Sequence, residues 1–176
     1  MAEPSAAIPS RPVESYLEAI ERILKEILRA GRFELSFSIR KQAPAEEEIE
    51  APEFVVDFTG PDTDLLLEKN GALLDALEYV VLRAARLEEH LFGRITLDAE
   101  DWRRLRAEEL KLTARIAAER VVETGEPFAL QAMNARERRI VHLALRDLAA
   151  VRTASEGLGP ERKVVIHPAS PPAPKR

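Results

Sequence analysis

The chain has 176 residues, a length that suits one medium domain or two small ones. With 45% apolar and 32% charged residues, its composition is that of a folded protein and excludes the low-hydrophobicity class of disordered chains. The lack of cysteine excludes disulfides, thiolate metal sites and cysteine nucleophiles, and the three histidines (His90, His142 and His167) do not have the spacing of a zinc site.

Neither a signal peptide nor a membrane span is predicted. Residues 1–12 are polar and interrupted by proline, so they lack the apolar core of a signal peptide. No apolar run approaches the roughly 20 residues that cross a bilayer. We therefore expect a cytoplasmic protein that does not insert into membranes and binds no cofactor or metal.

Charge is distributed unevenly along the chain, whose net charge at pH 7 is −5. Residues 1–99 hold 11 Lys and Arg against 20 Asp and Glu, a net of −9, while residues 100–176 hold 15 against 11, a net of +4. This asymmetry predicts an acidic module followed by a basic one, with attraction for polyanions confined to the second. The alternative is a chance scatter of solvated charges.

The first half is predicted to follow the order helix, strand, strand, helix, helix, strand. Apolar residues spaced by three and four predict the helices, and strict alternation predicts the strands. The six elements cover residues 13–30, 33–39, 54–58, 62–67, 72–86 and 94–98. Gly31 is the stop signal of the first helix, and the acidic loop at 45–53, which lacks the interleaved glycine of a calcium loop, is predicted to be solvated.

The second half is predicted to contain two helices and a strand pair. A helix over 100–123 ends at Gly125, and Asn134 with Glu137 forms the start signal of a helix that runs to about Asp147. Phe128–Leu130 is too short to assign. The strand pair covers 150–155 and 162–166, and the end segments 1–12 and 167–176, the second with four prolines, are predicted to be disordered.

The turn at 68–71 lies where a KH domain places the Gly-x-x-Gly loop that clamps a single-stranded nucleic-acid backbone. The contacts of such a loop would come from Lys69, Asn70 and Gly71. Glu68 replaces the first glycine, and its carboxylate repels phosphate. A purely structural junction between two helices is therefore the competing interpretation.

A basic helix in the second half is the stronger candidate site. Arg138, His142 and Arg146 are spaced by four and share one face, while Ile140, Leu143 and Ala144 can face inward. Arginine offers forked donors to phosphate, and histidine can stack on a base. Further cations that could extend this surface flank the next turn at Arg152, Arg162 and Lys163. The alternative is a solvated helix face whose histidine bonds a neighbouring backbone carbonyl.

Catalytic motifs are missing from the sequence. There is no Walker loop, no His-Glu-x-x-His and no Gly-x-Ser-x-Gly. Ser155–Gly157 is more simply a turn than a nucleophile site, because no base can be assigned to it. An RNA-modifying enzyme therefore lacks identifiable catalytic groups, and we expect a protein that is not an enzyme.

The segment from Val13 to Ile166 resembles the bacterial Jag family, whose members are also called KhpB, EloR or SpoIIIJ-associated proteins. They join a KH domain to an R-three-H domain, named for Arg-x-x-x-His. The matching blocks are Leu74–Leu77, Met133–Asn134, Glu137–His142, Ser155–Gly157, Gly159–Pro160 and Arg162–Ile166.

The resemblance implies an α+β fold, with a type II KH-like αββααβ module over 13–99 and a small α/β R-three-H module over 100–166. It implies binding of single-stranded RNA, or of single-stranded DNA. The contacts that it implies are Arg138, Arg139, His142, Ser155, Glu156 and Gly157, with the cations Arg146, Arg152, Arg162 and Lys163 on the same module.

It also implies post-transcriptional regulation of bacterial cell elongation and division. The implied partner is a KH-only protein or a second copy of the chain. The competing hypothesis is a protein-interaction adaptor that pairs through the KH-like module and binds little RNA.

Overall fold

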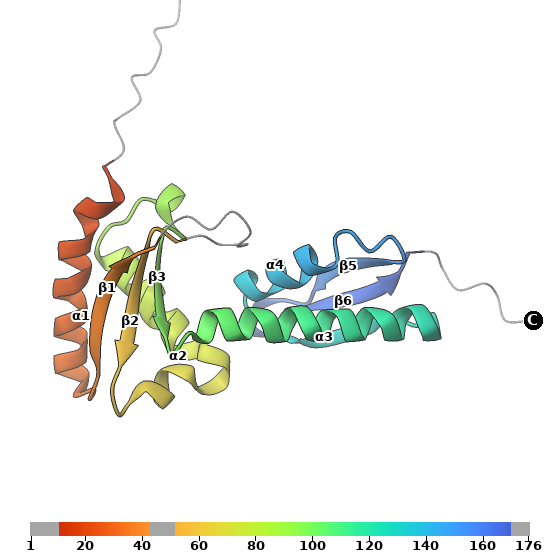
Figure 1. Cartoon of the computed structure of the whole chain (residues 1–176), viewed down its shortest axis with the longest axis horizontal. Helices are drawn as coiled ribbons and strands as arrows, with labels where there is room; N and C mark the ends of the chain where they lie inside the picture. The colour runs from red at the N-terminus through yellow and green to blue at the C-terminus, as the bar shows by residue number, and fades with distance from the viewer. Residues whose placement is uncertain (1–10, 43–51, 170–176) are drawn as a thin grey trace, which may run out of the picture. The chain divides into compact units, whose positions relative to one another are not determined.

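A computed structural model describes residues 11–42 and 52–169 of the chain (Figure 1). The chain divides into two compact units, Met1–Trp102 and Arg103–Arg176. Most of the acidic loop predicted at 45–53 lies outside the described residues, as do residues 1–10 and 170–176 of the two predicted tails.

The first unit has the element order that the sequence predicts. Its elements are a 3₁₀ turn (Val13–Tyr16), α1 (Leu17–Gly31), β1 (Ser36–Lys41), β2 (Phe54–Thr59), α2 (Thr63–Ala84), a 3₁₀ turn (Glu89–Leu91) and β3 (Ile95–Ala99). The helix α2 is interrupted at residues 68–71, whose backbone is not helical, so it consists of two helical segments.

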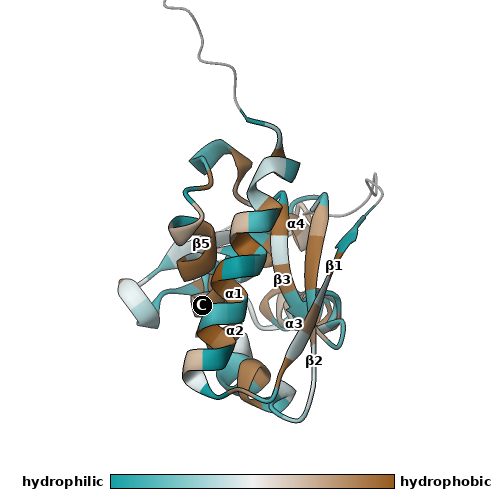
Figure 2. Cartoon of the chain, turned by 90° about the vertical axis from the view of Figure 1, so that its left-hand side faces the viewer, coloured by the Kyte–Doolittle hydropathy of each residue, from teal (hydrophilic) through white to brown (hydrophobic). Residues whose placement is uncertain are grey.

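The sheet of the first unit has the strand order β1-β2-β3. Strands β1 and β2 are antiparallel, and β2 and β3 are parallel, which requires the crossover that α2 provides. Against this sheet α1 buries Ile20, Leu24 and Leu28. Figure 2 shows hydrophobic residues alternating with hydrophilic ones along α1, as an amphipathic helix requires.

The boundaries of α1 and β1 differ from the prediction. Gly31 is still helical, and Arg32 adopts the left-handed conformation (φ 56) that ends the helix. A Cβ at Gly31 would lie 2.5 Å from the Phe33 ring, so a larger residue there would require this half-buried ring to move. Strand β1 starts at Ser36 because the preceding backbone bonds elsewhere, with the Glu34 N–H donating to the Asp62 carboxylate at 2.7 Å.

The second unit is a three-stranded sheet with two helices. Its elements are α3 (Trp102–Thr124), β4 (Phe128–Ala132), α4 (Ala135–Ala144), β5 (Val151–Glu156), a 3₁₀ turn (Gly159–Glu161) and β6 (Lys163–Pro168). The strand order is β4-β6-β5, and both strand pairs are antiparallel. Strand β4 forms where the sequence permitted no assignment.

The predicted disordered tail at 167–176 is wrong in its first three residues, the last of which, Ala169, donates its N–H to the Ala150 carbonyl at 2.9 Å. His167 pairs with Arg152 and Pro168 with Val151, so β6 continues through Pro168. A proline is tolerated there because β4 pairs with β6 only as far as Ile166, so this end of β6 has β5 as its one neighbour and is an edge. Just before α3, Glu100 and Asp101 have positive φ (54 and 57), so this helix begins at Trp102 and not at residue 100.

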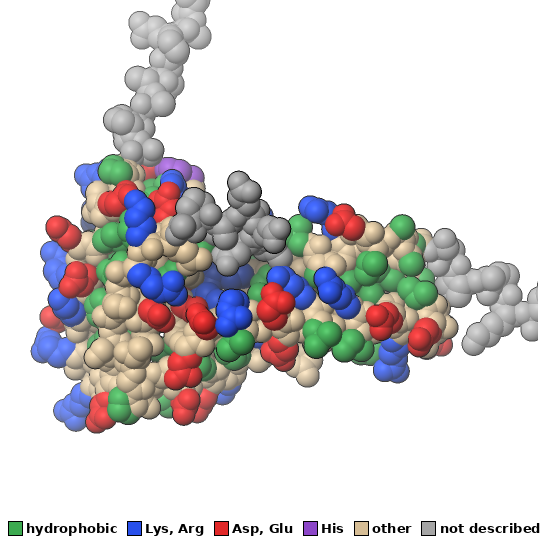
Figure 3. Space-filling model, in the orientation of Figure 1, with side chains coloured by type: hydrophobic (Ala, Val, Ile, Leu, Met, Phe, Trp, Pro, Cys, Tyr) green, Lys and Arg blue, Asp and Glu red, His purple; other side chains and the backbone are tan. Residues whose placement is uncertain are grey.

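The core of the second unit joins small residues of α3 to the sheet. Helix α3 buries Leu110, Ala114, Ala117, Ala118 and Val121. Helix α4 buries Ile140 and Val141, whereas Leu143 and Ala144, predicted to face inward, are only half-buried. Figure 3 shows hydrophobic side chains on the visible surface of this unit as well, and α3 exposes Leu105, Leu112, Ile116 and Val122.

Across residues 11–42 and 52–169, no helix combines the length and the apolar character that crossing a bilayer requires.

Candidate nucleic-acid interface

Helix α4 begins with the capping signal that the sequence predicts. The Asn134 side chain accepts from the Glu137 N–H at 2.8 Å, and the Glu137 carboxylate accepts from the Asn134 N–H at 3.1 Å. The two bonds satisfy backbone donors that the first turn of a helix leaves unpaired. They also fix the direction of α4, and with it the direction of its basic side chains.

Glu137 also forms a buried ion pair, which the sequence pattern does not predict. Its carboxylate is 6% exposed and accepts from Nε of Arg106 on α3 at 2.7 Å, while Nη1 of Arg106 donates to Glu109 at 2.8 Å. Burial by itself lowers the pKa of Arg106, but the hydrogen bonds to Glu137 and Glu109 outweigh it, so that pKa is raised. The pair ties α3 to the start of α4.

Arg138 is half-buried and anchored to the backbone. Its Nη1 donates to the Met133 carbonyl at 2.9 Å, and the Met133 N–H donates to the Arg162 carbonyl at 3.0 Å. The guanidinium has five N–H donors, and this one bond leaves the others for a ligand. Arg138 therefore lies beside the backbone that precedes β6.

His142 bridges α4 and β5 through both ring nitrogens. Nδ1 lies 2.6 Å from the Thr153 hydroxyl, and Nε2 lies 2.9 Å from the Ser155 hydroxyl. The alternative prediction, that His142 bonds a neighbouring backbone carbonyl, is wrong, because both of its partners are side-chain hydroxyls. Both ring nitrogens are thus engaged by side chains of the sheet, which fixes the orientation of the half-buried ring.

The environment of His142 favours its neutral form. Burial lowers the pKa of His142, and the positive charge of Arg138 lowers it further. A neutral imidazole has one donor and one acceptor nitrogen. One hydroxyl therefore donates to the ring, and the other accepts from it and keeps its own O–H for a ligand.

The turn after β5 is held by a hydrogen bond and by a glycine. Glu156 accepts from His167 Nε2 at 3.1 Å. Gly157 has φ +88, and a Cβ there would lie 2.9 Å from the Glu161 carbonyl oxygen and 3.3 Å from the Cα of Arg162. The Ser155–Gly157 turn therefore packs directly against the segment that carries Arg162.

Alternation along β5 separates the candidate residues onto two faces of the sheet. Thr153 and Ser155 face α4, as do their fully buried partners Ile166 and Val164. Arg152 and Glu156 point to the opposite face. Lys163 lies directly across from Glu156 in the strand register and shares that face. The three cations expected to extend one surface are therefore divided, with Arg152 and Lys163 on the other face.

One cluster of candidates lies together. His142 and Ser155 meet between α4 and β5, and Arg138 lies one helical turn before His142 and bonds the Met133 carbonyl. The backbone of Arg162 lies beside Met133 and Gly157. Arg146 is exposed and forms an ion pair with Asp147 at 3.3 Å, and Arg139 lies on the exposed side of α4.

Two residues of this site were not predicted. Thr153 could have been found, because Thr153 and Ser155 alternate on one face of a predicted strand. Arg106 could not, because nothing local to the sequence links it to Glu137.

The loop of the first unit is a tight helix break. Lys69, Asn70 and Gly71 have φ values of 51, 60 and 72. A Cβ on Gly71 would lie 2.6 Å from the Trp102 indole nitrogen, and φ there is positive, so glycine suits this position better than a residue with a side chain. Glu68 has φ −54 and ψ 150, which any residue adopts, so its backbone does not require the missing glycine.

No group of three or more potential metal ligands occurs among the residues that the structure describes.

Comparisons with known proteins identify relatives for both units. Residues 108–168 match the R-three-H domain family. The RNA-binding protein KhpB of Clostridium symbiosum is 37% identical over 161 residues, which cover 92% of this chain and 70% of the relative. KhpB of Bacillus subtilis is 34% identical over 111 residues, covering 62% of this chain and 53% of that protein. The chain thus spans about half the length of the Bacillus relative.

Proposed function

The chain belongs to the KhpB family, whose relatives are named RNA-binding proteins, and we propose that it too binds RNA, as single strands and chiefly through its second unit. On this proposal it is a regulator and not an enzyme.

The observation that carries the proposal is Arg138 one helical turn before His142, whose ring bonds the Thr153 and Ser155 hydroxyls. The backbone of Arg162 bonds Met133, the residue whose carbonyl accepts from the Arg138 guanidinium. Arg138 has guanidinium donors left over, and within the described residues the Arg162 side chain has no hydrogen bond or ion pair. Arginine donors and a hydroxyl at one edge suit the phosphate oxygens of a nucleic-acid backbone. The net charge of +4 over residues 100–176 adds attraction at longer range.

His142 acts here as a positioning residue. It holds the Thr153 and Ser155 hydroxyls in place and leaves one of them able to donate to phosphate. Arg139, on the exposed side of α4, adds a further cation near the same edge. Arg152 and Lys163, on the opposite sheet face, can reach only a strand of RNA that wraps around β5.

The first unit is proposed to be a type II KH-like module over 13–99, with the R-three-H module over 100–166. Its element order supports this assignment, and Glu68 weakens the case that its loop clamps RNA. Pairing with a KH-only protein or a second copy is a proposed role for this unit. Cytoplasmic location and post-transcriptional control of bacterial cell elongation and division are proposals that rest on the family alone.

The test is a titration of the full chain with labelled oligouridylate at several salt concentrations. Arg138→Ala and Arg162→Ala should each weaken binding about tenfold and reduce the slope of log K against log salt by about 0.7 for each phosphate that is no longer neutralised. The matched control is Arg115→Ala, an exposed arginine on α3, which should leave both quantities unchanged.

The competing adaptor function predicts a different result. If the wild-type chain shows no RNA binding at low salt, the proposal fails and pairing through the first unit becomes the better account. Equal weakening in the Arg115 control would instead show diffuse attraction by charge without a defined site.

A further inference from the structure

Strand β1 forms a free edge of the first sheet. The strand order β1-β2-β3 gives β1 only one neighbour, and within the described residues no backbone hydrogen bond joins its outer side to another segment. An edge strand presents a row of N–H and C=O groups that another strand can pair with. This edge therefore has the geometry for addition of a strand.

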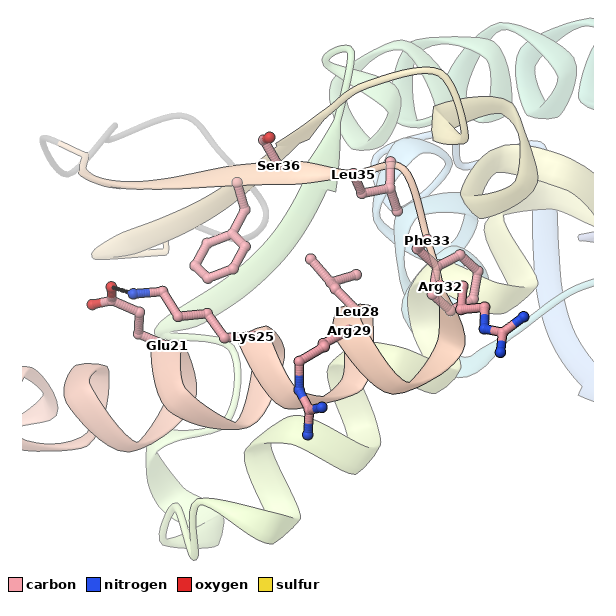
Figure 4. Close-up of a pocket in the computed structure, with 9 residues that line it drawn as sticks. Glu21, Lys25, Leu28, Arg29, Arg32, Phe33, Leu35 and Ser36 are labelled. Carbon is pink, nitrogen blue, oxygen red and sulfur yellow. Dashed lines mark hydrogen bonds and ion pairs between the residues drawn. The ribbon is translucent and has the colours of Figure 1, made fainter.

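A groove with an apolar floor lies between this edge and α1 (Figure 4). Leu35 and Phe37 alternate along the chain and are half-buried, and they lie over Leu28 of α1. The Phe37 ring is 5.9 Å from the Phe58 ring, which holds it in place. Side chains of an added strand that point toward α1 would cover this floor.

The rim of the groove is cationic. Lys25, Arg29 and Arg32 lie along α1, and Figure 4 shows Arg29 and Arg32 extending from the helix into the open. Along the side of the unit that α1 forms, Figure 3 shows Lys and Arg side chains interspersed with acidic ones. Glu21 is the one carboxylate among the lining residues.

These cations are available to a ligand. Lys25 is paired with Glu21 at 2.6 Å and Arg29 with Glu26 at 2.7 Å, but all four side chains are at least 46% exposed. Exposed pairs of this kind contribute about 0–1 kcal/mol and exchange readily. The Arg32 side chain has no ion pair or hydrogen bond among the residues described.

We infer that this groove binds an extended acidic peptide segment of a partner protein, which adds to the sheet as a fourth strand beside β1. Backbone bonds to β1 provide the pairing. Every second side chain of the added strand points toward α1, and of these the central ones are apolar and cover Leu35 and Phe37, while the outer ones are carboxylates that reach the cationic rim. This interaction is separate from the proposed RNA binding and does not depend on it.

An acidic peptide fits this groove better than RNA does. Strand addition uses the free backbone of β1, which RNA cannot pair with in this way. Residues 1–99 also carry a net charge of −9, which repels a long polyanion, whereas a short segment interacts mainly with the cations within about a Debye length.

The probe is a fluorescently labelled peptide, Glu-Ser-Val-Ser-Val-Ser-Glu, titrated with the full chain at low salt. As an extended strand it directs both glutamates and both valines to one face. We expect saturable binding, with shifts of the backbone amide resonances of Ser36–Lys41, and no binding of the matching peptide with lysine in place of both glutamates. N-methylation at every second residue of the peptide removes the N–H donors on one edge of the added strand and leaves those on the other edge. One methylation register should weaken binding by more than about tenfold, because it removes the bonds to β1, and the other should not.

Charge reversal tests the rim. Arg32→Glu should weaken peptide binding about tenfold, because it turns an attraction into a repulsion. The control Arg22→Glu changes an exposed arginine of the same helix that does not line the groove, and should have a much smaller effect.

Three results would overturn the inference. These are failure of the acidic peptide to bind, equal sensitivity to both methylation registers, and equal weakening by the two charge reversals. Oligouridylate that shifts the same β1 amides and displaces the peptide would also overturn it, because it would identify an RNA groove.

Discussion

Replacing Glu137 by alanine should destabilise the second unit more than any exposed substitution. The carboxylate caps α4, a contribution of about 1 kcal/mol, and it is the buried partner of Arg106. Removal of one partner of a buried ion pair costs about 3–5 kcal/mol. Arg106 keeps its bond to Glu109, which offsets part of this cost, so we expect a total of about 3 kcal/mol. For a unit of this size that corresponds to a fall in Tm on the order of 15 °C.

The assay must observe the second unit separately, because a chain with two units need not unfold in one step. Hydrogen exchange of the buried amides of Val141 and Ile166 in increasing urea provides this. Glu109→Ala is the matched control, since it removes the exposed partner of Arg106 and should cost less than about 1 kcal/mol. If Glu137→Ala costs no more than this control, the Arg106–Glu137 pair does not join α3 to α4 as described.

Three further substitutions have defined outcomes. Burial and the charge of Arg138 lower the folded-state pKa of His142 from its ordinary value of 6.5, so the unfolded chain binds the proton more readily. The contribution of His142 to stability is therefore complete at pH values above its ordinary pKa of 6.5 and is lost as the pH falls from there through the folded-state pKa. His142→Gln should reduce the fall in the Tm of the second unit between about pH 7.5 and about pH 5.5, and identical pH profiles would contradict the assignment. Gly71→Ala should destabilise the first unit, measured by urea unfolding, by about 1–3 kcal/mol more than Gly93→Ala, because both have positive φ but only Gly71 meets a neighbouring side chain. Lys69→Ala should change the affinity for oligouridylate by less than about twofold, and a reduction as large as that of Arg138→Ala would assign RNA contact to the first unit.

Local patterns were sufficient to predict the order of elements in the first unit. Apolar spacing in α1 and alternation around Phe54 are properties of a few consecutive residues, and the sheet and helices simply bury those faces. The start of α4 was equally predictable, because the Asn134–Glu137 capping box is complete within four residues. Each of these features needs no information from distant parts of the chain.

Features that depend on tertiary pairing were not predictable in this way. Strand β4 is short, and its pairing with β6 decides that it is a strand. The hydroxyl partners of His142 come from another element, so the spacing of Arg138 and His142 predicts a shared helix face but not which way the ring points. The same limit applies to Arg106, which lies 31 residues from Glu137.

Because Trp102 lies close to Gly71, its intrinsic fluorescence can report on the loop of the first unit. Trp102 is the only tryptophan in the chain, and its indole nitrogen contacts the loop formed by Lys69, Asn70 and Gly71. A ligand that rearranges this loop must change the polarity around the indole. Emission wavelength and iodide quenching of the unlabelled protein therefore monitor the loop during an RNA titration.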